Sequence, residues 1–480
     1  MIKVSLSWIA AQVEGQLLGA DQSIEVVSTD TRNLPPASLF VALKGDRYDA
    51  HAFLADAIAS GAAALMVQQS LSAEQAGAIS QIVVADTRYA LGQLAHAVRK
   101  EVNPTVIAIT GSSGKTTVKE MLAKILNSQG QVLATAGNFN NDIGVPLTLL
   151  RLTQADRYAV VELGANHLGE IAYTTRLTEP DVAIINNVAP AHVEGFGSIH
   201  GVFRAKSEIF RALAADGLAL TPQNSEFAEC WQQQLNSRNH LSFGQLQNGY
   251  AQADCYADDI TIDSRGCAEF TLHLAARFAA EPTRVKLNLP GLHNVDNAVV
   301  ALTAAVAVGC PLQQAVTALA QLEPVAGRLN VVQVSEHLQL IDDTYNANVG
   351  SVKAALDMLG AYPGYTIMAL GDMGELGAQA RQYHEEIGAY AIKVGINNLF
   401  TLGVLSQSAS EVFNGRGGRH FSDFEGLIGA IIATVQQAPA PVTILAKGSR
   451  SAHMERVIQA LEVRQAELQP RIDSEGQHAC

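Results

Sequence analysis

The sequence predicts an α/β protein with mostly parallel sheets, divided into three domains. Short, apolar, β-branched runs such as 106–109 and 182–185 alternate with helix-length stretches along most of the 480 residues. This alternation is typical of β-α-β units, in which a helix carries the chain from one parallel strand to the next. A chain of this length ordinarily forms about three domains of roughly 100 to 200 residues each.

Composition excludes several classes of protein. Apolar residues make up 48% of the chain, yet no uninterrupted apolar run is as long as the roughly 18 residues that a membrane span needs. The first residues lack the long apolar core of a signal peptide, so we expect a cytoplasmic protein with its five cysteines reduced. A formal charge of −14 argues against a general nucleic-acid binder, and an anionic substrate would need a locally basic site.

The first predicted domain covers residues 1–102. Small polar and charged side chains gather there at 28–32 and within 40–51, beside a short apolar strand. Such a segment is either a binding edge or an ordinary surface loop, and the residues alone leave both interpretations open.

The second predicted domain, residues 103–325, begins with the strand 106–109 and a glycine loop that leads into an amphipathic helix. Gly111 and Gly114 let the backbone approach an anion, Lys115 adds a positive charge, and the hydroxyl of Thr116 is a typical Mg²⁺ ligand. Ile109 stands where the longer phosphate-loop pattern has its first glycine. The alternative is a Gly/Ser turn with a solvated lysine, but the strand-loop-helix context favours a nucleotide site.

Three residues after the phosphate loop are candidates for a metal-dependent site. Glu162 ends the strand 158–161, where ligands of open α/β sheets bind. His192 follows the strand 182–185, and Lys206 lies on a helix predicted over 198–213. Taken singly, each also fits an ordinary surface or loop role.

Two asparagines, Asn294 and Asn297, lie three residues apart where a helix should begin. Their amides both donate and accept hydrogen bonds, as the edge of adenine requires, although Asn294 is also a good helix cap. In the third predicted domain, residues 326–480, strands at 338–341, 366–370, 400–402 and 442–445 alternate with helices. Polar clusters follow two of these strands, at 342–348 and 447–450, and such loops usually face a ligand cleft.

These motifs, in this order, resemble the Mur ligase family of ATP-dependent amide-bond-forming enzymes. The resemblance rests on 110–117 as the phosphate loop, 291–298 as the adenine-contacting motif and Gly327-Arg328 as the phosphate-contacting pair. Within the family, the segments 137–148, 187–192, 342–348 and 447–450 resemble the member that joins D-alanyl-D-alanine to UDP-N-acetylmuramoyl-tripeptide.

The resemblance implies an N-terminal domain that binds the UDP substrate, a central ATPase domain and a C-terminal Rossmann-like domain that closes over the site. It implies ATP and Mg²⁺ as cofactors, an acyl-phosphate intermediate, a monomer, and no nucleic-acid partner. The implied catalytic residues are Lys115, His192, Lys206 and Arg328. The implied metal ligands are Thr116, Glu162, His192 and a carbamylated Lys206.

The remaining implied contacts fall into two groups. The nucleotide would be bound by Gly111, Ser112, Ser113, Gly114, Lys115, Thr116, Thr117, Asn294, Asn297, Arg328 and Asp343. The other substrates would be bound by Ser28, Thr29, Asp30, Arg32, Lys44, Gly45, His51, Asn138, Asn141, Tyr345, Asn346, Asn348, Lys447, Ser449 and Arg450.

Two positions depart from the family pattern, since Val349 replaces an expected proline and His453 an expected glycine. Both lie beside loops expected to bind the acceptor substrate. The alternatives are another ligase of the same superfamily, which the segment 342–348 disfavours, and a regulatory P-loop ATPase, which would hydrolyse ATP without an acceptor.

Overall fold

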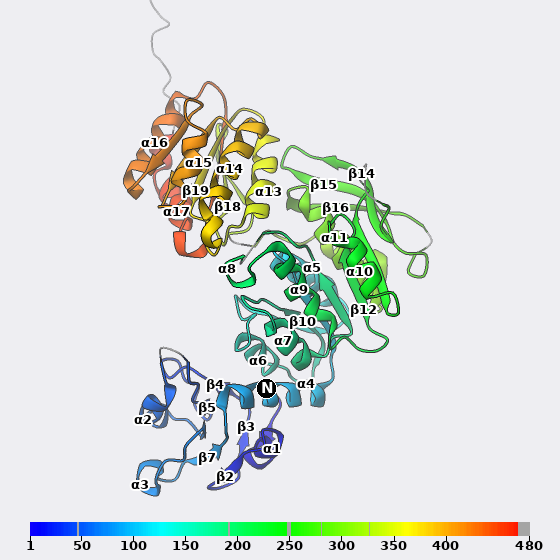
Figure 1. The fold of residues 1–480 in the computed structure, drawn as a ribbon, viewed down its shortest axis with the longest axis vertical. Helices are drawn as coiled ribbons and strands as arrows, with labels where there is room; N and C mark the ends of the chain where they lie inside the picture. The colour runs from blue at the N-terminus through cyan, green and yellow to red at the C-terminus, as the bar shows by residue number, and fades with distance from the viewer. Residues whose placement is uncertain (46–47, 191–192, 247–250, 280, 326, 469–480) are drawn as a thin grey trace, which may run out of the picture.

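The computed structural model describes residues 1–45, 48–190, 193–246, 251–279, 281–325 and 327–468. Three large sheets follow one another along the long axis of the molecule, each with its own helices (Figure 1). This confirms the predicted α/β architecture with three domains. Among the described residues, no helix combines the length and the apolar character that a membrane span requires.

The N-terminal domain contains a five-stranded sheet in the order β2-β7-β6-β5-β4 and a small β1-β3 ladder. The strands β4 to β7 are parallel, and β2 joins β7 in antiparallel fashion. Its elements are β1 (Val4–Ser5), α1 (Leu6–Gln12), β2 (Gln16–Leu18), β3 (Ser23–Ile24), β4 (Val27–Ser28), β5 (Leu39–Val41), η1 (Ala50–Phe53), α2 (Leu54–Ala59), β6 (Ala64–Val67), α3 (Ala73–Ala76), β7 (Ser80–Val83) and α4 (Thr87–Val102).

The central domain contains a nine-stranded sheet in the order β16-β15-β14-β13-β12-β11-β8-β10-β9, parallel from β9 to β14 and antiparallel from β14 to β16. Its strands are β8 (Thr105–Thr110), β9 (Gln131–Ala134), β10 (Asp156–Glu162), β11 (Val182–Ile185), β12 (Leu218–Pro222), β13 (Asn239–Gln245), β14 (Cys255–Ile262), β15 (Cys267–His273) and β16 (Thr283–Pro290). Its helices are α5 (Lys115–Leu126), α6 (Gly144–Leu149), α7 (Glu170–Thr178), α8 (Val193–Phe196), α9 (Ile199–Ser207), η2 (Glu208–Phe210), α10 (Ala228–Gln234), α11 (His293–Ala307) and α12 (Leu312–Leu319).

The C-terminal domain contains a six-stranded sheet in the order β17-β18-β22-β19-β20-β21, parallel except for β17. Its strands are β17 (Asn330–Ser335), β18 (Leu338–Asp343), β19 (Tyr365–Gly371), β20 (Asn398–Leu402), β21 (Gly418–Phe421) and β22 (Val442–Lys447). Its helices are α13 (Val349–Gly360), η3 (Gly377–Gln379), α14 (Ala380–Val394), α15 (Gln407–Val412), α16 (Phe424–Gln437), η4 (Arg450–Ala452), α17 (Glu455–Val463) and η5 (Gln465–Leu468).

Most predicted strands are confirmed to within one or two residues. The antiparallel β14–β16 extension was not predicted, because its strands follow one another without the intervening helices that mark a parallel sheet. The helix predicted over 198–213 is shorter, since α9 gives way at Glu208 to the short 3-10 helix η2.

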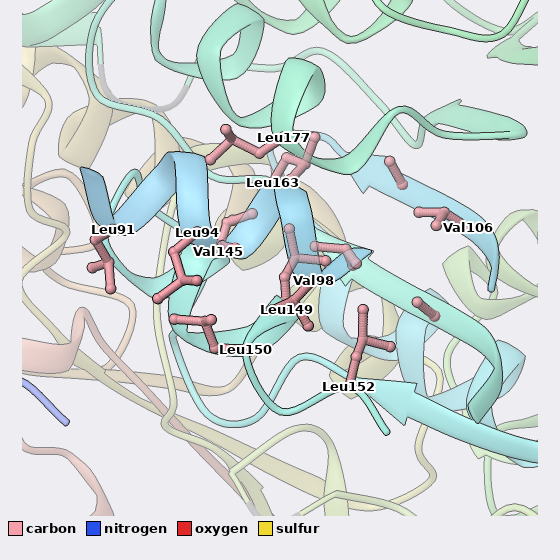
Figure 2. Close-up of a cluster of buried hydrophobic side chains, with 14 of the residues drawn as sticks. Leu91, Leu94, Val98, Val106, Val145, Leu149, Leu150, Leu152, Leu163 and Leu177 are labelled. Carbon is pink, nitrogen blue, oxygen red and sulfur yellow. The ribbon is translucent and has the colours of Figure 1, made fainter. Parts of the chain in front are cut away.

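Helix α4 joins the N-terminal and central domains. Its leucines Leu91 and Leu94 and its valine Val98 belong to one buried cluster with leucines from α6 and α7 (Figure 2). The guanidinium of Arg99 donates to the carbonyls of Thr178 and Glu179 at the end of α7, at 2.8 Å each. These carbonyls have no partner within a helix, and a cation suits the negative end of the helix dipole.

The domain boundaries at residues 102 and 325 remain predictions, and the first of them falls at the end of a helix that two domains share. Because α4 packs on α6 and α7, the last helix assigned to the N-terminal domain also belongs to the core of the central one. Burial of a shared apolar surface stabilises this junction.

The Leu94→Ala substitution should destabilise the protein by ~2–5 kcal/mol, because it removes a fully buried side chain and leaves a cavity at this junction. We expect the first transition of urea unfolding, followed by circular dichroism, to shift to lower urea. Leu168 is 46% exposed, and Leu168→Ala should change stability by only about 0.5 kcal/mol or less. An unshifted transition for Leu94→Ala would contradict a stabilising role for this buried cluster.

Candidate active site

The loop between β8 and α5 lies unusually close to its neighbours. Gly114 has a φ of 76°, in the left-handed region. A Cβ at this position would stand 2.4 Å from Nδ2 of Asn186 and 2.8 Å from Oδ1 of Asn297, so only glycine fits. The first N–H groups of α5 follow at once and have no partner within the helix, which makes this turn a suitable anion site.

Lys115 lies across this loop. Its Nζ donates to the carbonyl of Gly111 at 2.8 Å. Burial lowers the pKa of Lys115, although the carboxylate of Glu162 nearby acts in the opposite direction. An anion bound in the loop would favour the charged form of the lysine and be held by it.

Two asparagines that were not among the predicted site residues, Asn186 and Asn187, fix the shape of the loop. Asn187 accepts a hydrogen bond from the backbone N–H of Ser113 at 2.9 Å, and its own carbonyl accepts one from the N–H of Ser112 at 3.1 Å. Asn186 donates to the carbonyl of Ser113 at 3.0 Å. Both follow β11, the parallel neighbour of β8, so the same sheet edge carries them. Their place after a predicted strand was the signal that could have revealed them.

Glu162 lies at the carboxyl end of β10, in register beside Ile109 of β8. Its two carboxylate oxygens accept hydrogen bonds from the hydroxyl of Thr116 and the amide of Asn140, both at 2.9 Å. The side chain is almost completely buried. A carboxylate and a hydroxyl in contact are the oxygen ligands that Mg²⁺ prefers.

Lys206 is buried at the end of α9, with only 1% of its surface exposed. Burial, reinforced by the positive charge of Lys115, lowers its pKa to about 7, while Glu162 acts in the opposite direction. Its Nζ lies 5.8 Å from the centre of the Phe196 ring. The alternative of an ordinary surface role for Lys206 is therefore wrong, and the amine is largely neutral above pH 7. The third candidate, His192, lies outside the described residues.

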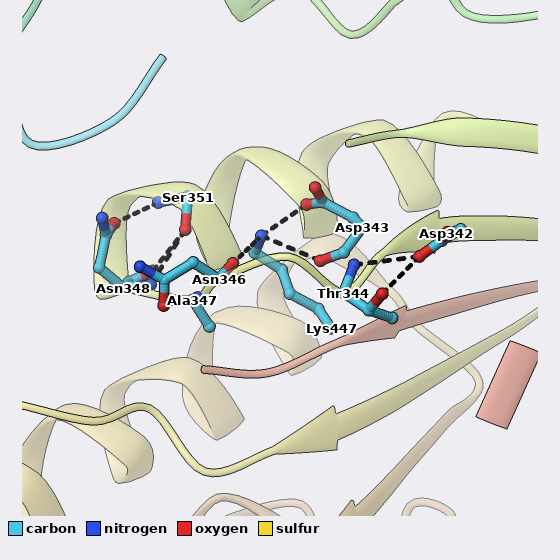
Figure 3. A network of polar contacts seen from close by, with 8 residues as sticks. All are labelled: Asp342, Asp343, Thr344, Asn346, Ala347, Asn348, Ser351 and Lys447. Carbon is cyan, nitrogen blue, oxygen red and sulfur yellow. Dashed lines mark hydrogen bonds and ion pairs between the residues drawn. The ribbon is translucent and has the colours of Figure 1, made fainter. Parts of the chain in front are cut away.

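The facing wall comes from the C-terminal domain, where β18 and β22 are parallel neighbours and Asp343 pairs with Lys447. Lys447 is buried and donates to the carboxylate of Asp343 at 2.6 Å and to the carbonyl of Asn346 at 2.8 Å (Figure 3). Burial raises the pKa of Asp343, an effect that Lys447 opposes. The pair fixes the turn after β18 against the end of β22.

Two side chains of this wall, those of Arg328 and Asn348, reach the central domain. Arg328 donates from Nη2 to the Thr116 hydroxyl at 2.9 Å, and its guanidinium lies 4.3 Å from the centre of the Tyr345 ring. Asn348 caps α13 and donates from Nδ2 to the carbonyl of Ser112 at 3.1 Å. The phosphate loop is thus contacted directly by both domains.

Asn294 and Asn297 are buried on the first turn of α11 and are bonded to each other, since Nδ2 of Asn297 donates to Oδ1 of Asn294 at 2.9 Å. Asn294 also donates to the carbonyl of Pro290, and Asn297 accepts from Asn186. Asn294 does not cap the helix, because the cap position is Leu292 and has no side-chain bond. The alternative of a simple cap is therefore wrong.

These groups surround one cavity of about 250 Å³ between the central and C-terminal domains. Its predicted lining residues are Ser112, Ser113, Gly114, Lys115, Thr116, Thr117, Glu162, Asn294, Asn297, Arg328, Asp343, Tyr345, Asn346, Asn348 and Lys447. Residues that were not predicted include Asn186, Asn187, Asn224, Gly244, His293 and Asp296. Burial, followed by the charge of Lys447, lowers the pKa of His293 to about 4, so its ring is neutral.

The predicted residues of the N-terminal domain lie elsewhere, in loops after the parallel neighbours β4 and β5. Arg32 binds the carboxylate of Asp30 at 2.9 and 2.7 Å, and the hydroxyl of Ser28 donates to the carbonyl of Asp30. Thr29 follows Ser28 directly. The loop therefore presents an exposed, internally paired cluster at the carboxyl edge of this sheet.

The second N-terminal loop is fixed by His51. Its Nδ1 lies 2.6 Å from the Asp49 carboxylate, and its Nε2 accepts the backbone N–H of Gln68 at 3.0 Å. The backbone of Lys44 forms an isolated antiparallel β-bridge with the backbone of Asp49, and Gly45 follows Lys44 in the chain. With both nitrogens bound, His51 shapes this loop.

Asn138 and Asn141 lie in the loop before α6, outside the lining of the cavity. Oδ1 of Asn141 accepts the backbone N–H of Gly144 at 2.8 Å, so this amide starts the helix. Their neighbour Asn140, which was not predicted, is the one that reaches Glu162.

Ser449 and Arg450 follow β22. Ser449 is buried and donates its N–H to the carbonyl of Asp372 at 2.8 Å, whereas the Arg450 side chain is 66% exposed. The guanidinium of Arg450 lies 6.0 Å from the centre of the Tyr345 ring. His453 has a φ of 51°, a left-handed conformation that explains why glycine was expected there.

Comparisons with known proteins agree with this architecture. The model of the Mur ligase middle domain matches residues 109–305, and that of the Mur ligase glutamate ligase domain matches residues 327–450. The UDP-N-acetylmuramoyl-tripeptide–D-alanyl-D-alanine ligase of Escherichia coli K12 is 46% identical over 462 residues, which cover 96% of this chain and 99% of that protein. The enzyme of the same name from Bacillus subtilis 168 is 33% identical over 475 residues, covering 96% and 99%.

Solved structures give the same result. A crystal structure of MurF from Acinetobacter baumannii superposes with a TM-score of 0.88 at 37% identity, covering 95% of this chain and 98% of that one. MurF from Thermotoga maritima in complex with ADP superposes with a TM-score of 0.80 at 26% identity, covering 92% and 98%. From the matched domains and these similarities, the chain belongs to the Mur ligase family.

Proposed function

We propose that this protein is an ATP-dependent ligase that joins D-alanyl-D-alanine to UDP-N-acetylmuramoyl-tripeptide in the synthesis of the peptidoglycan precursor. The observation that carries the proposal is the contact of Arg328 with Thr116, beside Glu162 and Lys206, because it places a cation of one domain at the phosphate loop of another. The names of the similar ligases support the identity of the two substrates. Since ATP is a cosubstrate, we place the reaction in the cytoplasm.

The phosphates of ATP would bind in the loop 111–117, with Lys115 and Arg328 offsetting their charge. Asn294 and Asn297 would lie near the adenine, and Asp343 near the ribose. Thr116 and Glu162, with Lys206 as its carbamate and His192, would hold Mg²⁺. When bound, Mg²⁺ would stabilise negative charge on the phosphoryl group during its transfer.

Lys206 suits the predicted carbamylation. Carbamate formation needs a neutral amine that attacks CO₂ and loses a proton, and the pKa of Lys206, near 7, supplies that amine at physiological pH. The product is an anion next to Glu162, Lys115 and Thr116, where a cation of the metal site would compensate both negative charges.

A carboxylate is a poor electrophile, so the tripeptide must be activated before it can form an amide. Its terminal carboxylate would attack the γ-phosphorus of ATP, releasing ADP and giving an acyl phosphate, while Lys115 and Arg328 stabilise the charge on the transferring group. The amine of D-alanyl-D-alanine would then attack the acyl carbon, and the tetrahedral intermediate would expel phosphate. Holding the three substrates together is worth ~7–11 kcal/mol of barrier in favourable cases.

The two other substrates would enter from opposite sides. The loops with Ser28, Thr29, Asp30, Arg32, Lys44, Gly45 and His51 would bind the UDP end, and Asn138 and Asn141 the tripeptide arm. The acceptor would lie along Tyr345, Asn346, Asn348, Lys447, Ser449 and Arg450. Arg450 is the exposed cation of this group, and its nearest described carboxylate, that of Glu455, stands 3.9 Å away.

The direct test is phosphate release from ATP and Mg²⁺ with the tripeptide substrate alone, the dipeptide alone, and both together. We expect release only with both, and a product heavier than the tripeptide by one dipeptide less water. Substrate-independent hydrolysis without such a product would instead indicate a regulatory ATPase. A product with a diamino acid or glutamate in place of the dipeptide would indicate another ligase of the superfamily.

Lys206→Ala should lower kcat at least about 100-fold, because it removes the anionic ligand proposed for the metal site. In ¹³C-bicarbonate, the wild-type protein should give a carbamate carbon signal in its NMR spectrum that Lys206→Ala lacks. The signal should grow as the pH rises through about 7, since the neutral amine is the reactive form.

Lys119 offers a matched control, because it is equally buried but stays paired with Glu120 at 2.7 Å. Lys119→Met should keep the carbamate signal. A wild-type spectrum without the signal, or a Lys206→Ala spectrum that retains it, would rule out carbamylation of Lys206.

Arg450→Gln should raise KM for D-alanyl-D-alanine about 10- to 100-fold and leave KM for ATP unchanged, because a guanidinium paired with the terminal carboxylate of the dipeptide would be lost. The wild type should also use D-alanyl-D-alaninamide, which lacks that carboxylate, poorly, and the variant should no longer distinguish the two acceptors.

Arg464→Gln serves as the control, since Arg464 pairs with Glu425 at 2.7 Å at the far side of the domain and should leave both KM values unchanged. If Arg450→Gln raised KM for ATP and for the dipeptide equally, Arg450 would have no specific part in acceptor binding.

A further inference from the structure

One part of the cavity wall, at the end away from the phosphate loop, combines apolar side chains with a few polar ones and carries no lysine or arginine among the described residues. It is formed by Phe243, Leu289 and Pro290 together with the polar residues Asn224 and Asp296. In the sheet, β13 is separated from β8 by β12 and β11. Since neighbouring strands lie ~4.8 Å apart, the end of β13 is roughly 14 Å from the phosphate loop, which leaves room for a ribose between the phosphates and a base.

Asp296 is the unusual residue at this end. It lies on the first turn of α11, and one carboxylate oxygen, Oδ2, accepts a hydrogen bond from Nε2 of Gln245 at 3.1 Å. The other oxygen, Oδ1, is buried and has no hydrogen-bond partner among the described residues. Burial raises the pKa of Asp296 to about 6, so the carboxylate is mainly ionised at neutral pH. A buried acceptor of this kind is costly unless a donor reaches it.

The surrounding amides cannot supply that donor without breaking other bonds. Gln245 is fixed in orientation, because its Nε2 donates to both the Leu292 carbonyl and Asp296. Oδ1 of Asn294 accepts from Asn297, and Oδ1 of Asn297 accepts from Asn186. Each of these two amide oxygens already accepts one hydrogen bond, and the remaining N–H groups of the asparagines are the donors they can offer a base. Among the polar side chains of α11 that line this end, Asp296 is the one with an acceptor oxygen that has no partner among the described residues.

We propose that the Asp296 carboxylate accepts a hydrogen bond from the exocyclic amine of adenine and thereby selects ATP over GTP, an inference that rests on the proposed use of ATP at this site. Adenine presents an amine donor at carbon 6 and ring-nitrogen acceptors beside it. The carboxylate matches the amine, and the remaining asparagine N–H groups match a ring nitrogen. Guanine carries a carbonyl at carbon 6, which would set an acceptor against Asp296.

The test is calorimetric binding to the full-length protein of ADP and of purine riboside 5′-diphosphate, which differs from ADP only in lacking the exocyclic amine. The wild type should bind ADP at least about tenfold more tightly, the usual effect of losing a hydrogen bond to a charged group. In Asp296→Ala, both diphosphates should bind with the same affinity. This combination of a protein change and a ligand change isolates the one contact.

Asp254→Asn is a matched control, because this carboxylate bonds Ser242 on β13 and does not line the cavity. It should keep the preference for ADP. Asp296→Asn preserves the size of the side chain and should bind GDP more tightly than the wild type does, since its amide can donate to the guanine carbonyl. If circular dichroism shows that the Asp296→Ala variant is unfolded, Asp296→Asn replaces it in the comparison of the two diphosphates.

Three results would overturn the inference. Equal losses of affinity for the two diphosphates in the Asp296 variants would mean that the carboxylate only supports the fold of α11. A wild type that binds both diphosphates equally would mean that the protein does not recognise the exocyclic amine of adenine. A wild type that binds neither would instead refute the proposed use of ATP, so the two failures are distinguishable.

Discussion

The site depends on one hydrogen bond between domains, from Arg328 to the hydroxyl of Thr116. Thr116 in turn donates to Glu162, so three residues from two domains form a continuous polar chain beside the phosphate loop. The bond brings a cation to the point where phosphoryl charge would develop, in a buried setting where electrostatic interactions are stronger than in water. Without the C-terminal domain, the loop would have its anion-binding turn but lack the facing wall of the cavity.

Much of this arrangement could be predicted, because parallel strands end at one edge of a sheet. Glu162 and the phosphate loop follow strands whose apolar, β-branched sequences are unambiguous, and their closeness then follows from topology. The same reasoning correctly placed the clusters that contain Asp343 and Lys447 at the ends of strands, and the structure adds that these two strands are parallel neighbours. The fold and the polar edges of its sheets are thus encoded locally.

The remaining features depend on contacts that sequence periodicity does not record. Burial turns Lys206 from an ordinary helix lysine into an amine with a pKa near 7, and only tertiary packing could reveal this. Asn348 caps α13 and also donates to the carbonyl of Ser112 in the phosphate loop, a contact that crosses a domain interface and leaves no trace in the periodicity of either segment. Asp296 lies in the motif 291–298, of which only the asparagines were predicted to bind the nucleotide. That one of its oxygens bonds Gln245 and the other has no partner among the described residues follows only from the tertiary contacts.

The most direct measurement of the central claim is a double-mutant cycle on kcat, with Thr116→Val, Arg328→Gln and the combined variant assayed for ligated product. If the bond between the domains organises the site, the two losses should be strongly non-additive, with a coupling of ~1.5–3 kcal/mol, as for hydrogen bonds to charged groups. Additive losses, with a coupling near zero, would contradict this account and would mean that the two residues act independently.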